Sequence, residues 1–486
     1  MSNHLKLLIV EPDKGLRTTW VKLIRGDTDL HVEEAASTGE ALKKVKKGLH
    51  DLVLCDRDME DMEWPGFVEG LKRVPRSEYS PGVYLIACGA EAGGLECLAQ
   101  GADDFMHKPV DPEEILTRVK VGCKAVLKLS QKAAAAGRMF REMDVLLIQE
   151  GGCAPGYNPV TAFITHHLET RGRAVYGTRE GFKSLVSGKD DDFLRLVYDK
   201  DHYKKLDHIP GVFHAAPLSE SRGAQLRTER YREFLRPEIQ KKAAATVKKR
   251  RMRAIIAIGG NGTFKGIQSL CDLLDTSIQV FFIPVTIDSD VAGTDCIGQH
   301  TGVEVGAEKI RCYMADARTH QRTYILEMMG AKSGFHALHS CLGARAHLAV
   351  LPGSEIDHRA VVEAVNSREE CVIVVAEGYK KSEREGESCN AAEFFHRELL
   401  GTGIPIKRKV VCEPFSRDIR GAAPNNQDIT LAQRMAYNVA SYLQAGTSRL
   451  MPAVLSGREY AIPFNEIRTD NMKEKDLLVL SNRLTG

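Results

Sequence analysis

Glycine-rich turns that follow apolar runs are the feature that most constrains the fold of this chain. The runs at 145–148, 254–258 and 280–283 are apolar throughout, a pattern typical of parallel strands buried on both faces. The first run leads into Gly151-Gly152 and the second into Gly259-Gly260-Asn261-Gly262-Thr263. Because the carboxyl ends of parallel strands meet at one edge of a sheet, the sequence predicts an α/β fold with these turns close together.

The third run leads into a segment with two carboxylates, Thr286-Ile287-Asp288-Ser289-Asp290. Glycines at a strand end let the backbone approach phosphates, and amides at a helix start bind anionic oxygens. One carboxylate can take a proton from a hydroxyl while the other helps to hold Mg²⁺. The segment therefore predicts a phosphoryl-transfer site. The alternative is that the glycines serve tight turns only and Asp290 caps a helix.

Length and charge narrow the class of protein. A chain of 486 residues suggests two or three domains. Its 67 basic and 65 acidic residues argue against nucleic-acid or membrane-surface partners. The basic run at 241–253 is interpreted as an amphipathic helix that precedes the strand at 254. No apolar run approaches the roughly 20 residues of a membrane span, and the polar start does not resemble a secretory signal. Twelve cysteines without a Cys-x-x-Cys pair indicate reduced thiols, so we expect a cytoplasmic protein.

The first 125 residues alternate apolar strands with amphipathic helical patterns. Strands are expected at 5–10, 51–55, 83–86 and 102–106, and helices at places such as 38–47 and 112–126. This order predicts a doubly wound parallel sheet whose active edge lies at the carboxyl ends of its strands. The acidic residues after the strands and Lys108 would converge at that edge.

This pattern resembles the flavodoxin-like receiver domain of response regulators. The resemblance implies that Asp56 accepts a phosphoryl group, that Lys108 pairs with it, and that Glu11 is one of two acidic metal ligands. Pro12 occupies the position of the second ligand, and whether Asp13 substitutes for it stays open.

The position that carries a phosphate-sensing hydroxyl in that family is Ala87 here. Two interpretations remain: a receiver phosphorylated by a histidine kinase partner, and a degenerate receiver that only mediates assembly.

We expect three parts: a receiver domain at 1–125, a helical linker at 126–143 and a larger α/β domain at 144–486. Residues 124–141 lack proline and are rich in Ala, Lys and Arg, which favours a continuous helix. Such a helix is either a stalk that transmits a rotation or a solvated spacer.

From residue 144 onward the chain resembles the phosphofructokinase family, a two-lobed α/β fold. The motifs that carry the resemblance are GGCAPGYN at 151–158, GGNGT at 259–263, TIDSD at 286–290 and EMMGA at 327–331. The resemblance implies ATP and Mg²⁺ as cofactors. Gly262 favours ATP because relatives that use pyrophosphate carry an aspartate there.

The resemblance also implies individual roles. Asp288 would be the general base, Thr286 would position the substrate, and Asp290 would support Mg²⁺ and the transferred phosphoryl group. The residues implied to bind the nucleotide are Gly151, Arg222, Gly260, Asn261, Gly262 and Thr263. The residues implied to bind the sugar phosphate are Arg322, Met329, Gly330, Glu377, Arg417 and Arg420.

Four residues differ from the pattern of that family, and these differences reduce the number of groups that would surround the metal and the substrate phosphates. Asn261 replaces an aspartate that contacts Mg²⁺ in that family. Cys153 replaces the aspartate of the first glycine loop. Ala331 replaces an arginine that stabilises transition-state charge, with Lys332 adjacent to it, and Val411 replaces an arginine that crosses a subunit interface. Asp288 is spared.

The leading hypothesis is ATP-dependent phosphorylation of fructose 6-phosphate, or a close sugar phosphate, to the 1,6-bisphosphate under control of the receiver. The alternative is a signalling pseudokinase that binds nucleotide or sugar phosphate without efficient turnover, and a third possibility is another acceptor. Because Arg322 would act across an interface, a homo-oligomer, tetramer or dimer, is expected. The charged stretch at 183–213 is either a lid, a partner site or a surface insertion.

Overall fold

The computed structural model describes residues 5–48, 50–74, 82–90, 94–330, 333–415, 417–469 and 481–484. The chain divides into two compact units, which are taken one at a time below. The first is Met1–Met139 with His208–Pro210, and the second is Phe140–Asp207 with Gly211–Gly486.

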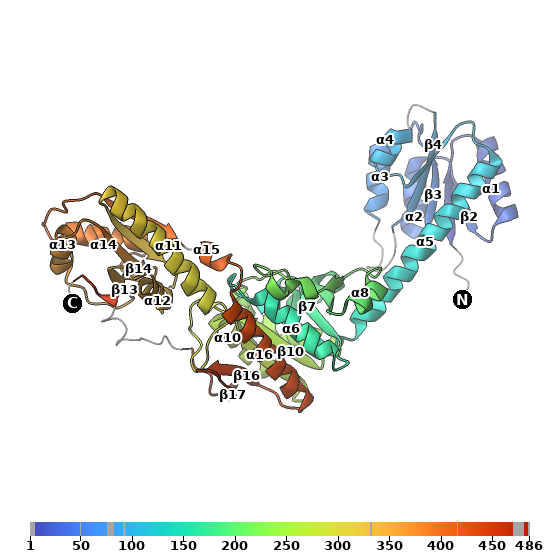
Figure 1. The fold of residues 1–486 in the computed structure, drawn as a ribbon. Helices are drawn as coiled ribbons and strands as arrows, with labels where there is room; N and C mark the ends of the chain where they lie inside the picture. The colour runs from blue at the N-terminus through green and yellow to red at the C-terminus, as the bar shows by residue number, and fades with distance from the viewer. Residues whose placement is uncertain are drawn as a thin grey trace. The chain divides into compact units, whose positions relative to one another are not determined.

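The first unit is built on a five-stranded parallel sheet in the order β2-β1-β3-β4-β5 (Figure 1). The strands are β1 (Lys6–Val10), β2 (His31–Ala35), β3 (Leu52–Asp56), β4 (Tyr84–Gly89) and β5 (Asp104–His107). All five residues of β3 are buried, as expected for a central strand covered on both faces. The doubly wound parallel sheet predicted from the alternating pattern is confirmed.

Helices cover both faces of this sheet and supply its two cores. The helices are α1 (Lys14–Asp27), α2 (Thr38–Gly48), α3 (Trp64–Lys72), α4 (Gly94–Ala99) and α5 (Pro112–Arg141). Side chains of α2, α3 and α4 share one core, and those of α1 and α5 share the other. The helix α5 is 30 residues long, so the predicted linker at 126–143 is helical as far as Arg141.

The second unit contains an eight-stranded sheet in the order β17-β16-β11-β10-β6-β7-β8-β9. Its strands are β6 (Val145–Glu150), β7 (Val175–Thr178), β8 (Phe193–Val197), β9 (Val212–His214), β10 (Ala254–Gly259), β11 (Gln279–Pro284), β16 (Leu450–Leu455) and β17 (Arg458–Pro463). The central strands β6, β10 and β11 run parallel, so the three turns that follow them open at one edge. The stretch at 183–213 contributes β8 and β9, and is therefore part of the sheet.

A second, four-stranded parallel sheet lies in the same unit, in the order β13-β14-β12-β15. Its strands are β12 (Thr323–Met328), β13 (Leu348–Val350), β14 (Cys371–Ala376) and β15 (Val410–Phe415). One of its cores packs side chains of these strands against α13 (His358–Asn366) and α14 (Ala391–Leu400). Two sheets in one unit give the two-lobed α/β fold expected from the sequence.

The remaining helices connect and cover these sheets. They are α6 (Tyr157–Glu169), α7 (Gly181–Ser187), α8 (Lys200–Leu206), α9 (Pro237–Lys249), α10 (Asn261–Cys271), α11 (Gln299–His320), α12 (Phe335–Ala344), α15 (Arg417–Arg420) and α16 (Asn426–Gln444), with 3-10 turns η2 (Asp190–Asp192), η3 (Ala216–Glu220) and η4 (Arg232–Leu235). The basic run at 241–253 forms most of α9, which buries Ala243 and Val247, as the amphipathic interpretation predicted. Among the described residues, no helix combines the length and apolarity that a bilayer crossing requires.

Candidate active site

A cavity of about 500 Å³ opens at the carboxyl ends of β6, β10 and β11. The two glycine turns and the segment at 286–290, which were predicted to converge, all contribute to its wall. Its lining residues include Gly151, Gly152, Gly260, Asn261, Gly262, Thr263, Thr286, Asp288, Asp290 and Arg420. Catalytic and nucleotide-binding candidates that are over 100 residues apart in the chain therefore face one space.

Two glycines are required by the geometry of this cavity. Gly151 has φ +107°, a backbone conformation that side chains disfavour. At Gly259, a Cβ atom would collide with the Thr263 hydroxyl and with the Glu150 carbonyl oxygen. Thr263 Oγ1 instead donates a hydrogen bond to that carbonyl oxygen over 2.9 Å, which fastens α10 to the end of β6.

The amino terminus of α10 faces the same space. Gly260 is its N-cap residue and supplies no side-chain cap, so the first turn presents backbone amides and the positive end of the helix dipole. A Cβ at Gly262 would meet no atom within 4 Å. This arrangement suits anionic oxygens such as those of a phosphate chain.

Asp288 is a cavity carboxylate whose pKa is raised. Burial and the negative charge of Asp290 raise the pKa of Asp288 to about 6, although Arg420 favours its charged form. Within the described residues, Asp288 Oδ1 is buried and has no hydrogen-bond partner. A carboxylate with a raised pKa and an unused oxygen is equipped to take a proton from a hydroxyl group.

The backbone around Asp288 is held in an unusual conformation. Ser289 has φ +48°, in the left-handed region that a serine rarely adopts. Thr286 Oγ1 accepts a hydrogen bond from Asp288 N at 3.1 Å and donates one to Asp290 Oδ1 at 3.3 Å. Ser333 Oγ donates to the Asp288 carbonyl oxygen at 2.7 Å. These contacts fix the two carboxylates relative to each other.

Two arginines bring positive charge to the cavity. Arg420 Nη1 donates to the Cys153 carbonyl oxygen over 2.9 Å, and the guanidinium groups of Arg230 and Arg420 both lie against Gly152. Arg222, the nucleotide-binding candidate from the sequence, is exposed and does not line the cavity. Its carbonyl oxygen accepts a hydrogen bond from Asn158. Arg230, eight residues later, lines the cavity instead.

The cavity residues fit a magnesium ion bound with a nucleotide. Asn261 Oδ1 is buried and, in the described part of the chain, lacks a hydrogen-bond partner, while Asn261 Nδ2 is 3.4 Å from Thr469 O. Among the described residues, no group of three His, Cys, Asp or Glu side chains has metal-binding geometry. Mg²⁺ bound with phosphates needs only one or two protein carboxylates, which Asp290 and its neighbours supply.

The sugar-phosphate candidates are less closely assembled. Glu377, after β14, is near enough for its charge to raise the pKa of Asp288. Arg322, Met329 and Arg417 are not part of the cavity wall. Gly330 follows Met329 at φ +123°. Ala331 and Lys332 lie outside the described residues.

An aromatic wall and a buried carboxylate were missed from the sequence. Phe182 and Phe234 stack with ring centroids 3.9 Å apart, and both line the cavity together with Tyr231. Glu150, the last residue of β6, is buried and lines the same cavity. The sequence did contain a sign of this carboxylate, because a glutamate ends a buried strand immediately before a glycine turn.

The first unit has its own acidic site, at the carboxyl edge of its sheet. Lys108 Nζ lies 2.9 Å from Glu11 Oε2 and 2.7 Å from Asp56 Oδ2, and both carboxylates are buried. Burial disfavours the ammonium ion, but its hydrogen bonds to Asp56 and Glu11 prevail and raise the pKa of Lys108. The structure therefore brings together the predicted phospho-acceptor, its lysine and one acidic ligand.

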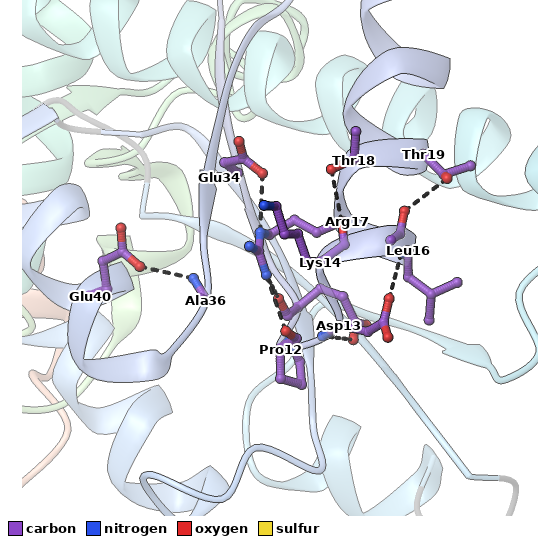
Figure 2. Close-up of polar contacts among 12 residues, drawn as sticks. Pro12, Asp13, Lys14, Leu16, Arg17, Thr18, Thr19, Glu34, Ala36 and Glu40 are labelled. Carbon is purple, nitrogen blue, oxygen red and sulfur yellow. Dashed lines mark hydrogen bonds and ion pairs between the residues drawn. The ribbon is translucent and has the colours of Figure 1, made fainter.

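Asp13 has a different environment. Its carboxylate accepts a hydrogen bond from Leu16 N at 2.7 Å and caps α1, as Figure 2 shows. Arg17 fills the neighbouring space, donating to the carbonyl oxygens of Glu11 and Pro12 and pairing with Glu34. Asp13 thus acts as a helix cap, and Pro12 offers only a carbonyl oxygen at the position of the second ligand.

The glycine turns, the uncapped helix terminus and the carboxylate of raised pKa are features typical of a phosphotransferase of the α/β class. The chain belongs to the phosphofructokinase family, whose family model, "Phosphofructokinase", matches residues 144–443. Residues 7–120 match the "Response regulator receiver domain" model, and the first unit is a receiver domain.

Curated relatives support this family over almost their whole length. ATP-dependent 6-phosphofructokinase 1 of Thermus thermophilus is 28% identical over 323 residues, covering 65% of this chain and 91% of that protein. ATP-dependent 6-phosphofructokinase of Thermotoga neapolitana is 29% identical over 348 residues, covering 70% and 99%.

Solved structures share the fold. Phosphofructokinase of Pichia pastoris in the T-state has a TM-score of 0.56 and 22% identity, covering 67% of this chain and 35% of that chain. A pyrophosphate-dependent phosphofructokinase from Nitrosospira multiformis has a TM-score of 0.56 and 18% identity, covering 69% and 86%.

Proposed function

We propose that this protein transfers the γ-phosphoryl group of ATP to fructose 6-phosphate or a close sugar phosphate, giving the 1,6-bisphosphate. The observation that carries the proposal is that Asp288 Oδ1 is buried and, among the described residues, lacks a hydrogen-bond partner in the cavity that the two glycine turns also line. A phosphoryl-transfer enzyme needs a base at the acceptor hydroxyl and donors for phosphate oxygens at one place.

In this mechanism Asp288 Oδ1 receives the proton of the acceptor hydroxyl. The amides at the start of α10 and the Gly151 turn hold the triphosphate, and Arg230 and Arg420 offset the charge that develops during transfer. Asp290 and Asn261 would hold Mg²⁺, which would neutralise negative charge on the phosphates during transfer. Thr286 keeps Asp288 and Asp290 in register through its hydroxyl.

The donor is proposed to be ATP rather than pyrophosphate. Gly262 leaves open space where an aspartate side chain would project, and the curated relatives reported above are named ATP-dependent enzymes. The aromatic wall of Phe182 and Phe234 gives a nucleobase a surface to contact, which pyrophosphate does not need.

Steady-state ADP release with fructose 6-phosphate and a panel of other sugar phosphates tests the activity. Turnover with one of them, absent when pyrophosphate replaces ATP, supports the proposal. The pseudokinase alternative is not favoured by the curated relatives, which are named ATP-dependent enzymes. That alternative gains only if no acceptor is turned over while ATP still raises the melting temperature.

We also propose that the receiver domain regulates this activity after phosphorylation of Asp56 by a histidine kinase. The contacts of Lys108 with Asp56 and Glu11 support this proposal. Treatment with acetyl phosphate and Mg²⁺, followed by intact-mass measurement, should add one phosphoryl group to the wild type and none to Asp56→Asn. Equal masses before and after treatment would contradict phosphorylation of Asp56 and support the alternative, in which the receiver only mediates assembly.

We further propose that the protein is a cytoplasmic homo-oligomer, either a dimer or a tetramer. The oligomer is proposed because Arg322 does not line the cavity of its own chain, so it would act in the cavity of a neighbouring subunit. Sedimentation at several concentrations tests the oligomer. If the protein stays monomeric and active, Arg322 has no role across an interface.

A further inference from the structure

Glu150 is the buried carboxylate that the proposed mechanism does not use. It ends β6 immediately before the phosphate-binding turn and lines the cavity. Its two carboxylate oxygens accept hydrogen bonds from two different segments: Oε2 from Phe182 N at 2.9 Å and Oε1 from Tyr231 N at 3.0 Å. One side chain therefore connects the start of α7 with the residue that precedes η4.

These two segments carry the aromatic wall. Phe182 belongs to α7 and Phe234 to η4, and their rings stack at an interplanar angle of 8°. Both rings pack against Gly266 of α10, where a Cβ atom would lie 2.8 Å from Phe182 and 3.2 Å from Phe234. A side chain at Gly181 would collide with the Glu150 carboxylate, and Gly181 has φ +53°. The wall is thus closely fitted around the two hydrogen bonds.

We propose that Glu150 is a positioning residue that holds the aromatic wall of the donor cavity and makes donor affinity depend on pH. The proposal deepens the proposed function, because it takes the nucleotide as the ligand of this cavity. Glu150 orients the groups that contact the donor, and both of its oxygens are directed at backbone amides.

The ionisation state of Glu150 decides whether both hydrogen bonds exist. A charged carboxylate accepts from both amides, whereas a protonated carboxyl group has one good acceptor and one hydroxyl. Burial raises the pKa of Glu150 to about 7, even though both amides favour the charged form, and the charge of Glu229 adds to the rise. Lowering the pH through 7 therefore releases one of the two segments.

The groups around Glu150 leave it as the titrating residue of the wall. Lys183 on α7 pairs with Glu180 and Glu229, so its charge is directed away from Glu150. Tyr157 on α6 and Thr263 on α10 donate to the Glu150 carbonyl oxygen. Arg230 precedes Tyr231 and faces the cavity.

Hydrogen exchange and calorimetry on the full-length protein test this inference. After correction for intrinsic rates, the amides of Phe182 and Tyr231 should lose protection in the wild type between pH 8 and pH 6. Binding of MgATP should weaken by about tenfold over the same range, as expected for the loss of one charge-assisted hydrogen bond. In Glu150→Gln, an isosteric change, one amide should be unprotected and MgATP affinity should be low at both pH values.

Glu229→Gln is the matched control. It removes a neighbouring charge and keeps both hydrogen bonds, so its pH dependence should persist with a midpoint at lower pH. The inference is overturned if Glu150→Gln keeps wild-type protection and pH dependence. Absence of MgATP binding at every pH would instead reject the proposed function, while the exchange data would still decide the role of Glu150.

Discussion

The receiver domain and the kinase cavity both place buried carboxylates at the carboxyl edge of a parallel sheet, but they satisfy them differently. In the receiver, Asp56 accepts from Lys108 Nζ and from Asp58 N, and Glu11 accepts from Lys108 Nζ and from Asp13 N. Every oxygen of this pair has a protein donor. In the cavity, Asp288 Oδ1 has none among the described residues, and its neighbour is another carboxylate.

This difference in hydrogen bonding determines how readily each carboxylate accepts a proton. A carboxylate paired with an ammonium ion is stable in its charged form and has little tendency to take a proton. A carboxylate buried beside a second one has a raised pKa and readily accepts a proton. Similar sheet edges therefore carry different carboxylates in the two units. Asp56 and Glu11 are paired with Lys108, whereas Asp288 has a raised pKa and can accept a proton.

The largest effect is expected from Asp288→Asn. The amide cannot accept the proton of the acceptor hydroxyl, so turnover should fall by about 10²–10⁴-fold. MgATP affinity should stay within a few-fold because the glycine turns and α10 are unaffected. Single-turnover ADP formation and calorimetry measure the two quantities, with Asp272→Asn, an exposed carboxylate beyond the carboxyl end of α10, as a control. Wild-type turnover in Asp288→Asn would remove the proposed base.

The receiver gives the opposite kind of prediction: loss of stability. Lys108→Met leaves Glu11 and Asp56 buried without their shared cation, which should cost about 3 kcal/mol of receiver stability. Both tryptophans, Trp20 and Trp64, belong to this domain. Urea unfolding followed by tryptophan fluorescence therefore reports the receiver selectively.

A matched lysine provides the control for that measurement. Lys44 pairs with Glu40 one turn away on α2, at a partly exposed position. Lys44→Met should cost no more than about 0.5 kcal/mol. Equal destabilisation by the two substitutions would mean that the buried pair at Lys108 is no stronger than a surface one.

The strands that bear both sites could be predicted from the sequence, because buried parallel strands are apolar along their whole length. Runs at 145–148, 254–258 and 280–283 correspond to β6, β10 and β11, and their convergence follows from parallel topology alone. The strand β2, with sequence HVEEA, lacks such a run and was not predicted.

Irregular segments could not be predicted in the same way. Residues 221–231 connect η3 to η4 without a period that would fix which side chain faces inward. Arg222 was expected in the cavity, whereas Arg230 lines it. Glu150 was missed because its partners, Phe182 and Tyr231, are 32 and 81 residues away. Only the tertiary structure brings those amides to one carboxylate.

The pH dependence of turnover sharpens the contrast between the two sites. Because the pKa of Asp288 is raised to about 6, the base is charged above pH 6 and protonated below it. The turnover number should be level above pH 7 and fall about tenfold per pH unit below 6. Rates at saturating MgATP between pH 5 and 8 measure this limb separately from the change in donor affinity assigned to Glu150. A level profile down to pH 5 would show that proton transfer to Asp288 does not limit turnover.

The smallest effect is expected from Asn261→Asp, which tests whether the cavity can tolerate more negative charge. Asn261 Oδ1, which has no hydrogen-bond partner among the described residues, becomes a charged oxygen near the glycine turn, so the KM for MgATP should fall a few-fold at pH 8. The new charge also disfavours ionisation of Asp288, so the acidic limb should move to higher pH. The variant should therefore be more active than the wild type at pH 8 and less active at pH 6. Lower activity at both pH values would mean that the asparagine amide itself serves the reaction, for example through its contact with Thr469.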